Sequence, residues 1–287
     1  MVDRVGIARY IADRMIRDRD ALAARWQNPE GTHTRHVYLD GLLPEELVRS
    51  IHAGFPAQGE GFFNRDSFRE KKKTLTDLSG LPAILDEVTY ALQSPVVIDA
   101  FAQIAGIEHL VPDPSLYAAG LSMMFKGDFL NPHVDNSHDA GRSLYRRLNF
   151  LYYVSPDWSL DDGGSFELWD PAVRRCKALE ARFNRLLVME THRTSWHAVS
   201  PVTADRPRCC VSTYVFSPES QDRSEYFHIT RFTGRPGQVG RRVRGVFDNA
   251  LRQFVAQVFK AGRGRRRVNA PQVVGAVAAP GPNRKSD

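Results

Sequence analysis

The first 112 residues show the apolar spacing of helices more often than that of strands. Residues 3–27 predict one helix packed on the body, because apolar side chains recur there at helical intervals: Val5, Ile7, Ile11, Met15, Ile16 and Leu22. Residues 36–55 predict a strand, a turn and a helix that begins at Pro44 and has acidic residues in its first turn. Two further helices are expected over 81–93 and 95–107.

After Pro112 the pattern changes to short runs of β-branched and aromatic residues. These runs are separated by loops rich in Gly, Asp and Pro, and they occupy residues 115–125, 146–155, 164–170, 184–191 and 208–217. Several short strands at this spacing predict a β-sandwich or a barrel. A C-terminal helix follows over 242–260, where one face would carry Val243, Val246, Phe247, Leu251, Phe254, Val255 and Val258.

The expected organisation is a single α+β domain over residues 1–262. Its parts are a mainly helical support (1–112), a β-core (113–220) and a C-terminal strand and helix (221–262). Residues 263–287 mix Arg, Gly, Pro and Ala without a sustained period, so we expect a basic, disordered tail. The sequence has no continuous apolar stretch of the length that a membrane span or a secretory signal requires.

Composition and charge narrow the class of protein. The chain has 287 residues, of which 42% are hydrophobic, enough to bury a sizeable core. Its net charge is +6, but residues 263–287 alone carry +5, so the body is nearly neutral and nucleic-acid binding is not favoured. Only three cysteines occur, Cys176, Cys209 and Cys210, which argues against a disulfide framework and for a reducing cytoplasm.

The segment His133-Val134-Asp135 is a candidate half of a metal site. On its own the triplet is weak, because histidine and aspartate are common in turns and at strand ends. His197 follows another predicted strand of the same β-core and completes a set of two imidazoles and one carboxylate. Such a set suits Fe(II), because it leaves three coordination positions open for a chelating cosubstrate and dioxygen.

From about residue 117 to 217 the chain resembles the Fe(II)/2-oxoglutarate-dependent dioxygenases, and within them the prolyl-4-hydroxylase-like branch. The resemblance is carried in order by "MFKGDFLNPHVDN", "LNFLYYVSPDW", "DDGGSFELWD", "FNRLLVMET", "WHAVSPV" and "RCCVSTYVF". It implies a double-stranded β-helix (jelly-roll) core with supporting N-terminal helices. It also implies that His133, Asp135 and His197 bind Fe(II), that 2-oxoglutarate and O2 are cosubstrates, and that ascorbate is a candidate stimulant.

The resemblance further implies a basic residue that holds the far carboxylate of 2-oxoglutarate. Arg206 and Arg208 both lie at the right distance after His197, and Arg208 is preferred because it directly precedes the predicted strand. Alternation along that strand would point Arg208, Cys210, Ser212 and Tyr214 to the inner face.

Tyr153 matches a family position whose hydroxyl bonds the same carboxylate, and Asn149 would share its face. Both also fit ordinary core positions. The family has a second tyrosine on an earlier strand, and here its position is occupied by Phe125 or Met124, neither of which can donate a hydrogen bond. Two roles are left open for the arginine cluster beside the metal loop, namely a solvated face or an anion-binding rim: Arg142, Arg146 and Arg147.

The activity implied by the resemblance is hydroxylation of an unactivated C–H bond, coupled to decarboxylation of 2-oxoglutarate to succinate and CO2. Desaturation and cyclisation use the same iron chemistry. A small-molecule substrate (an amino acid, a sugar or a biosynthetic intermediate) is the first expectation, and a peptidyl-prolyl hydroxylase is the alternative. A non-catalytic jelly-roll binding module is a third reading, which the complete ligand set disfavours.

Overall fold

A computed structural model describes residues 3–258, so the expected tail over 263–287 lies outside the described residues. The described part contains one sheet in which every strand pair is antiparallel. Its strands are β1 (His36–Asp40), β2 (Phe63–Asp66), β3 (Glu70–Leu75), β4 (Val111–Pro112), β5 (Gly120–Met124), β6 (Phe129–Val134), β7 (Tyr145–Tyr153), β8 (Phe166–Trp169), β9 (Cys176–Leu179), β10 (Arg185–Glu190), β11 (His197–Val199), β12 (Arg208–Ser217) and β13 (Arg231–Phe232).

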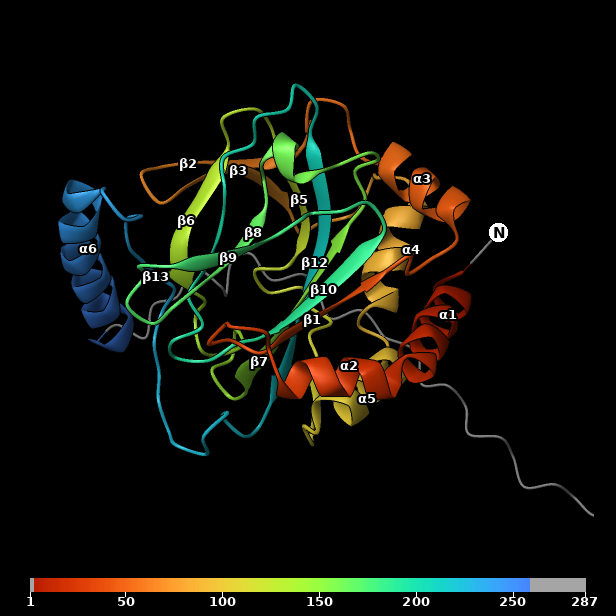
Figure 1. Cartoon of the computed structure of the whole chain (residues 1–287), viewed down its shortest axis with the longest axis horizontal. Coiled ribbons are helices and arrows are strands. Elements are labelled where there is room, and N and C mark those ends of the chain that lie inside the picture. Colours follow the sequence, from red (N-terminus) through yellow and green to blue (C-terminus); the bar gives the residue numbers. More distant parts are fainter. Residues whose placement is uncertain (1–2, 259–287) are drawn as a thin grey trace, which may run out of the picture.

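The sheet curls, so that its two halves face each other across an interior (Figure 1). The strand order is β1-β10-β7-β12-β5-β3-β6-β11-β8-β9, with β13 added to β6, β2 to β3 and β4 to β12. This order joins strands from distant parts of the chain, as a jelly roll does. The expected fold class, a jelly-roll core with supporting helices, is confirmed.

Five α-helices precede β4 in the chain, interspersed with β1, β2 and β3, and one α-helix follows β13. They are α1 (Arg4–Arg17), α2 (Arg19–Gln27), α3 (Glu45–Ala53), α4 (Ala83–Ala91), α5 (Pro95–Ala105) and α6 (Val239–Val258). None of the helices within residues 3–258 combines the length and apolar character of a segment that crosses a bilayer. Figure 1 shows α1, α2, α4 and α5 grouped on one side of the sheet and α6 at the other end of the molecule.

The prediction of a single helix over residues 3–27 was wrong, because the helix breaks at Asp18. The backbone N–H of Asp18 still donates to the Arg14 carbonyl at 3.3 Å, and its own carbonyl accepts from Leu22 at 3.0 Å, so Asp18 ends α1 and starts α2. The change of direction lets Trp26 of α2 pack edge-on against Phe101 of α5, with ring centroids 5.4 Å apart.

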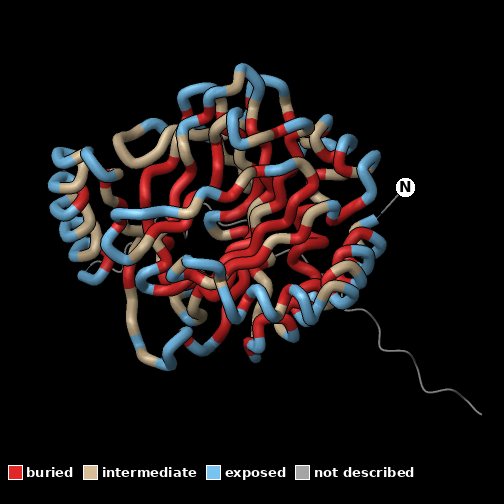
Figure 2. The backbone as a smooth tube through the Cα atoms, viewed as in Figure 1, coloured by how far each residue is buried: buried red, intermediate tan, exposed pale blue. Residues whose placement is uncertain are grey.

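Successive side chains of β7 point to opposite faces of the sheet and so belong to two different hydrophobic cores. Leu148, Phe150 and Tyr152 pack in the large core between the sheet and the helices. Leu151 and Tyr153 belong to the second core, inside the curled sheet. Figure 2 shows this buried centre, and the period of two along a strand explains why neighbouring residues serve different cores.

The hairpin of β2 and β3 was not expected from the sequence. β3 is paired with β5 through Lys73, Thr74 and Leu75 and with β6 through Glu70 and Lys71, so it bridges the two halves of the sheet. Its residues are all partly exposed, and its run of three lysines lacks the apolar alternation that marks a strand. Part of the N-terminal 112 residues therefore completes the β-core.

Candidate metal and cosubstrate site

His133, Asp135 and His197 converge in the interior of the curled sheet. His133 on β6 is the direct antiparallel partner of His197 on β11, and the two rings lie 4.0 Å apart between centroids. The Nε2 atoms of His133 and His197 lie 3.7 and 3.5 Å from the carboxylate oxygens of Asp135. All three side chains are buried, and one ligand atom from each lies within 4.8 Å of the others.

A hydrogen bond from Nδ1 to a backbone carbonyl orients each imidazole, so that Nε2 points toward Asp135. His133 Nδ1 lies 3.0 Å from the Asn131 carbonyl, and His197 Nδ1 lies 2.9 Å from the Ser195 carbonyl. A carbonyl only accepts, so each Nδ1 carries the proton and each Nε2 keeps its lone pair for a metal.

The ionisation states also fit a divalent cation. Burial, reinforced by His197, lowers the pKa of His133 to about 3, which keeps this imidazole neutral. Burial opposes the ionisation of Asp135, but His197 and Arg146 outweigh it and lower the pKa of this carboxyl group. Asp135 Oδ2 is buried and has no hydrogen-bond partner among residues 3–258. Neutral imidazoles and an unsatisfied carboxylate are the forms that bind a metal.

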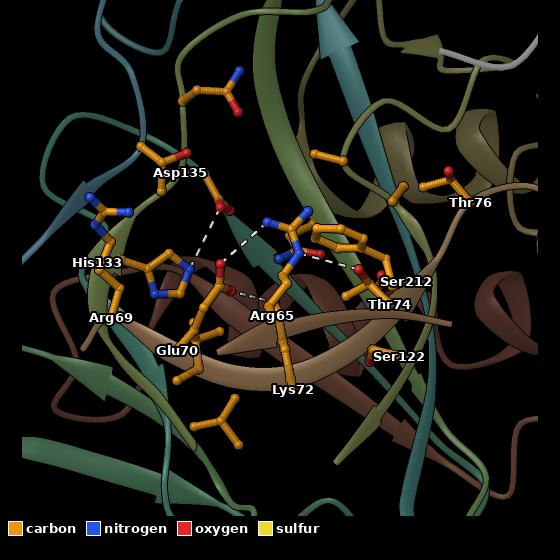
Figure 3. A pocket seen from close by; sticks show the side chains of 18 of the residues that line it. Arg65, Arg69, Glu70, Lys72, Thr74, Thr76, Ser122, His133, Asp135 and Ser212 are labelled. Carbon is orange, nitrogen blue, oxygen red and sulfur yellow. Dashed lines mark hydrogen bonds and ion pairs between the residues drawn. The ribbon is translucent and has the colours of Figure 1, made fainter. Parts of the chain in front are cut away.

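A cavity of about 1400 Å³ contains this set. Figure 3 shows His133 and Asp135 beside a network from the β2–β3 hairpin. In that network the Glu70 carboxylate forms ion pairs with Arg65 at 3.3 Å and with Lys72 at 3.4 Å. The hairpin therefore supplies one charged wall of the cavity, which sequence reasoning missed because no strand was expected there.

Arg208 lies in the same cavity as a buried cation without an anionic partner. The residue is only 3% exposed, and its guanidinium stacks over the Tyr153 ring at 4.7 Å and contacts Met124 Sδ at 3.7 Å. Within residues 3–258 no carboxylate lies at ion-pair distance from Arg208, and its Nε has no hydrogen-bond partner. An unpaired buried charge is costly, so this arrangement fits a carboxylate of the cosubstrate.

Tyr153 and Asn149 share that interior face. The Tyr153 hydroxyl and the Asn149 Oδ1 are both buried and lack a hydrogen-bond partner in the described part of the chain. Burial raises the pKa of Tyr153 well above its usual value, so the hydroxyl stays protonated and can donate. Arg208 and Asn149 line the same cavity as His133, Asp135 and His197, and Tyr153 lies beneath the Arg208 guanidinium.

Arg206 lies elsewhere. Its guanidinium donates to the Asp157 carbonyl at 2.6 Å and to the Asp162 carboxylate at 3.0 Å, on an exposed surface. The structure does not bring Arg206 to the cavity. Of the two candidates for the family's second tyrosine position, Met124 lines the cavity and Phe125 packs under Lys73.

A glycine makes room for Arg208. Gly164 has a φ of +60°, and a Cβ atom there would come within 2.6 Å of the Arg208 Cδ. The backbone before β8 therefore passes directly against the arginine side chain, and only glycine fits both the space and the left-handed conformation. The Gly163-Gly164 pair, predicted only as a turn, also shapes the cosubstrate site.

Arg146 is the functional candidate that the sequence left most open. The residue is 2% exposed, its guanidinium lies 3.7 Å from the Tyr214 ring centroid, and its Nη1 lies 3.7 Å from Asp135 Oδ1. Its Nε and Nη2 have no hydrogen-bond partner among the described residues. Arg147, by contrast, pairs with Glu190 at 3.7 Å and does not line the cavity.

A β-bulge explains why alternation did not reveal Arg146. On β12, Val215 is opposite Leu148 and Phe216 is opposite Arg146, so Arg147 has no direct partner and the register shifts. Simple alternation would place Arg146 with Leu148 on the helix side of the sheet, whereas the bulge turns it into the cavity.

Comparisons with known proteins agree with this geometry. Residues 119–216 match the family described as the 2OG-Fe(II) oxygenase superfamily. A prolyl 3-hydroxylase of Xenopus laevis, OGFOD1, is 24% identical over 212 residues, which are 65% of this chain and 37% of that protein. The chain therefore spans little more than a third of that relative.

Solved structures share the fold. A prolyl hydroxylase of Trichoplax adhaerens, in complex with a hypoxia inducible factor peptide, has a TM-score of 0.52 and 16% identity, covering 75% of this chain and 96% of that one. The carbocyclase SnoK of nogalamycin biosynthesis has a TM-score of 0.50 and 14% identity, covering 77% and 89%. The β-core of this chain is therefore similar to the 2OG-Fe(II) oxygenase superfamily, whose members use Fe(II), 2-oxoglutarate and O2.

Proposed function

We propose that this protein hydroxylates an unactivated C–H bond of a small molecule and releases succinate and CO2 from 2-oxoglutarate. The observation that carries the proposal is the convergence of His133, Asp135 and His197 in one cavity with the buried Arg208, which has no carboxylate partner among residues 3–258. The proposal treats residues 1–262 as one catalytic domain, because β1 and β3 are hydrogen-bonded into the β-core.

The side chains have distinct roles in this proposal. His133, Asp135 and His197 would hold Fe(II), which supplies the activation of O2 when it is bound. Arg208 would bind the far carboxylate of 2-oxoglutarate through parallel charge-assisted hydrogen bonds, and Tyr153 would donate a further hydrogen bond. Because these groups are buried, they exclude bulk water from the reacting atoms and strengthen each electrostatic contact.

The cavity supports a small substrate. Its volume of about 1400 Å³ exceeds the ~300–1,000 Å³ of ordinary ligand pockets, which leaves room for a second ligand beside the cosubstrate. The β2–β3 hairpin, residues 117–119 and α6 all contribute lining residues, so the space is walled from several sides. Arg146 would bind an acceptor oxygen of the substrate, such as a carboxylate or carbonyl, because its Nε and Nη2 lack partners among residues 3–258.

Anaerobic addition of Fe(II) and 2-oxoglutarate tests the metal and cosubstrate roles. Chelation of the keto acid to the iron should give a weak visible charge-transfer band. His133→Ala should abolish this band, whereas His138→Ala should retain it, because His138 is buried outside the cavity. A wild-type protein that never shows the band would refute the proposal.

A prolyl residue of a protein is the second candidate substrate. The similarity to the Xenopus prolyl 3-hydroxylase favours it, although this chain spans only 37% of that protein. Succinate release with added Fe(II), 2-oxoglutarate and O2 should be compared between a panel of amino acids, sugars and biosynthetic intermediates and a panel of proline-containing peptides. Stimulation by peptides alone would replace the small-molecule proposal with the prolyl one.

A further inference from the structure

Arg146 is held in a fixed orientation in the cavity and has two open donors. Its guanidinium lies 3.7 Å from the centroid of the Tyr214 ring and 5.6 Å from that of Phe216, so an aromatic wall positions it. Its Nε and Nη2 have no hydrogen-bond partner among residues 3–258. These two nitrogens lie along one edge of the guanidinium, and that edge can give two parallel hydrogen bonds to one carboxylate.

Arg146 and Arg208 occupy opposite ends of strand β12. Arg208 is the first residue of this strand, whereas Arg146 of β7 is opposite Phe216, close to its last residue. The strand has ten residues, which span roughly 30 Å at about 3.3 Å per residue. The two guanidinium groups therefore approach the candidate metal ligands from different ends of the cavity, and an anion bound by Arg208 leaves Arg146 open for a second anion.

The other charged residues of the cavity wall also favour an anion. Glu70 is already shared by Arg65 and Lys72 (Figure 3), and Asp248 is likewise shared by two arginines. Among the lining residues within 3–258, apart from the candidate metal ligands and Arg208, five cations face three carboxylates. This excess attracts a ligand with a carboxylate and disfavours a ligand whose only charge is positive.

Asn149 supplies an open acceptor beside the same tyrosine. It is the direct antiparallel partner of Tyr214, lines the cavity and is 3% exposed. Its Oδ1 is buried and has no hydrogen-bond partner in the described part of the chain. An acceptor and a pair of donors that flank one ring fit a ligand with an N–H or O–H group next to its carboxylate.

We infer that the substrate is an α-hydroxy or α-amino acid, whose carboxylate binds the Nε–Nη2 edge of Arg146 and whose α-substituent donates to Asn149 Oδ1. The inference rests on the hydroxylation proposed above and names its substrate class. Because Arg146 Nη1 lies 3.7 Å from Asp135 Oδ1, the hydroxylated C–H bond lies within a few bonds of the carboxylate. The substrate, 2-oxoglutarate and O2 give an alcohol, succinate and CO2, with one atom of O2 in the alcohol and the other in succinate.

Anaerobic calorimetry of the protein loaded with Fe(II) and 2-oxoglutarate tests the inference without turnover. At least one compound should bind from a panel of the common L-α-amino acids and their α-hydroxy analogues, and the tighter of the two series identifies the α-substituent. The matched amide of that compound should bind roughly 100-fold more weakly, because it lacks the charge that Arg146 recognises. The matched acid without the α-substituent should bind up to roughly tenfold more weakly.

Two variants separate the roles of the side chains. Arg146→Gln should raise the Kd of the acid roughly 100-fold and leave that of the amide unchanged. Asn149→Leu should abolish the preference for the α-substituted acid over the unsubstituted one. Arg142→Gln is the matched control, because Arg142 belongs to the same arginine cluster but does not line the cavity, and it should bind the acid like the wild type.

The charge-transfer band with Fe(II) and 2-oxoglutarate shows that each variant is folded and loaded. A wild-type protein that forms this band but binds no acid of the panel would overturn the inference and leave the proposed function standing. Amides that bind as tightly as the acids would also overturn it. So would a loss of 2-oxoglutarate affinity in Arg146→Gln as large as in Arg208→Ala, since Arg146 would then bind the cosubstrate.

Discussion

His133 and His197 are direct partners in the antiparallel pair of β6 and β11, and their imidazoles therefore project from the same face of the sheet. The distance between the two rings is set by the register of the strands rather than by a flexible loop. Because a slip by one residue would turn one imidazole to the other face, the candidate metal site depends on this strand register.

Removing one imidazole should cost most of the metal affinity. We expect His197→Ala to weaken Fe(II) binding by more than about 100-fold, because even the loss of a group that only orients a ligand costs 10–100-fold. Anaerobic titration calorimetry with Fe(II) measures this. His192→Ala provides the control, since His192 lies outside the cavity, and it should bind Fe(II) like the wild type.

Arg208→Ala should weaken 2-oxoglutarate binding far more than Arg206→Ala. The buried guanidinium of Arg208 has no carboxylate partner among residues 3–258, whereas Arg206 is already paired with Asp162 on the surface. Loss of charge-assisted hydrogen bonds in a buried site predicts roughly a 100-fold increase in Kd for Arg208→Ala. Titration of the metal-loaded protein with 2-oxoglutarate measures both variants, and the reverse ranking would refute the role given to Arg208.

Gly164→Ala should impair cosubstrate binding by displacing Arg208. The added methyl group would approach the Arg208 Cδ to 2.6 Å, so the arginine must move. We expect at least a roughly tenfold increase in the Kd for 2-oxoglutarate, with little change in Fe(II) affinity.

Gly80→Ala is the matched control for Gly164→Ala. Gly80 also has a positive φ, of +85°, but a Cβ atom there would meet nothing within 4 Å. Both variants carry the same kind of backbone penalty, of about 1 kcal/mol, and only Gly164→Ala disturbs Arg208. Equal Kd values for 2-oxoglutarate in the two variants would show that the contact with Arg208 is unimportant.

His192 should make the fold sensitive to acid. Burial, with the nearby charges of His33 and Arg35, lowers the pKa of His192 to about 4 from its ordinary 6.5. Between these two values the unfolded chain binds the proton and the folded chain does not. The stabilising contribution is therefore complete above pH 6.5 and is lost as the pH falls toward 4.

Urea unfolding of His192→Gln at neutral and mildly acidic pH measures this contribution. The decrease in free energy of unfolding from about pH 7 to about pH 4.5 should be smaller in the variant by on the order of 2 kcal/mol. His109→Gln is the control, because this histidine is exposed, and it should show the wild-type decrease. An unchanged pH dependence in His192→Gln would contradict the prediction.

The sequence predicted much of the site because its patterns are local. The HxD triplet, the histidine before the next strand and the alternation of Arg208, Cys210 and Ser212 each depend on a few neighbouring residues, and the structure places them together. The position of Arg146 in the cavity could not be predicted, because a bulge in β7 breaks the alternation and the sequence carries no sign of that bulge.

Two other features depend on tertiary contacts that local patterns do not show. The lysine-rich strand β3 has little intrinsic strand signal, and it is ordered by pairing with β5 and β6. The apolar face of α6 was correctly predicted as a face. The direction in which this face points is decided by Asn249 and Gln253, whose side chains are hydrogen-bonded to backbone groups of residues 227–232.

Strand β3 makes the β-core inseparable from the segment that precedes it in the chain. A protein trimmed to residues 113–220 would lose Arg65, Glu70 and Lys72 from one side of the candidate metal ligands, and the edges of β5 and β6 that pair with β3 would have no neighbour. Such a fragment would be prone to aggregate and its ligand set would be open to solvent, so grafting this chemistry into another scaffold requires residues 63–75 as well.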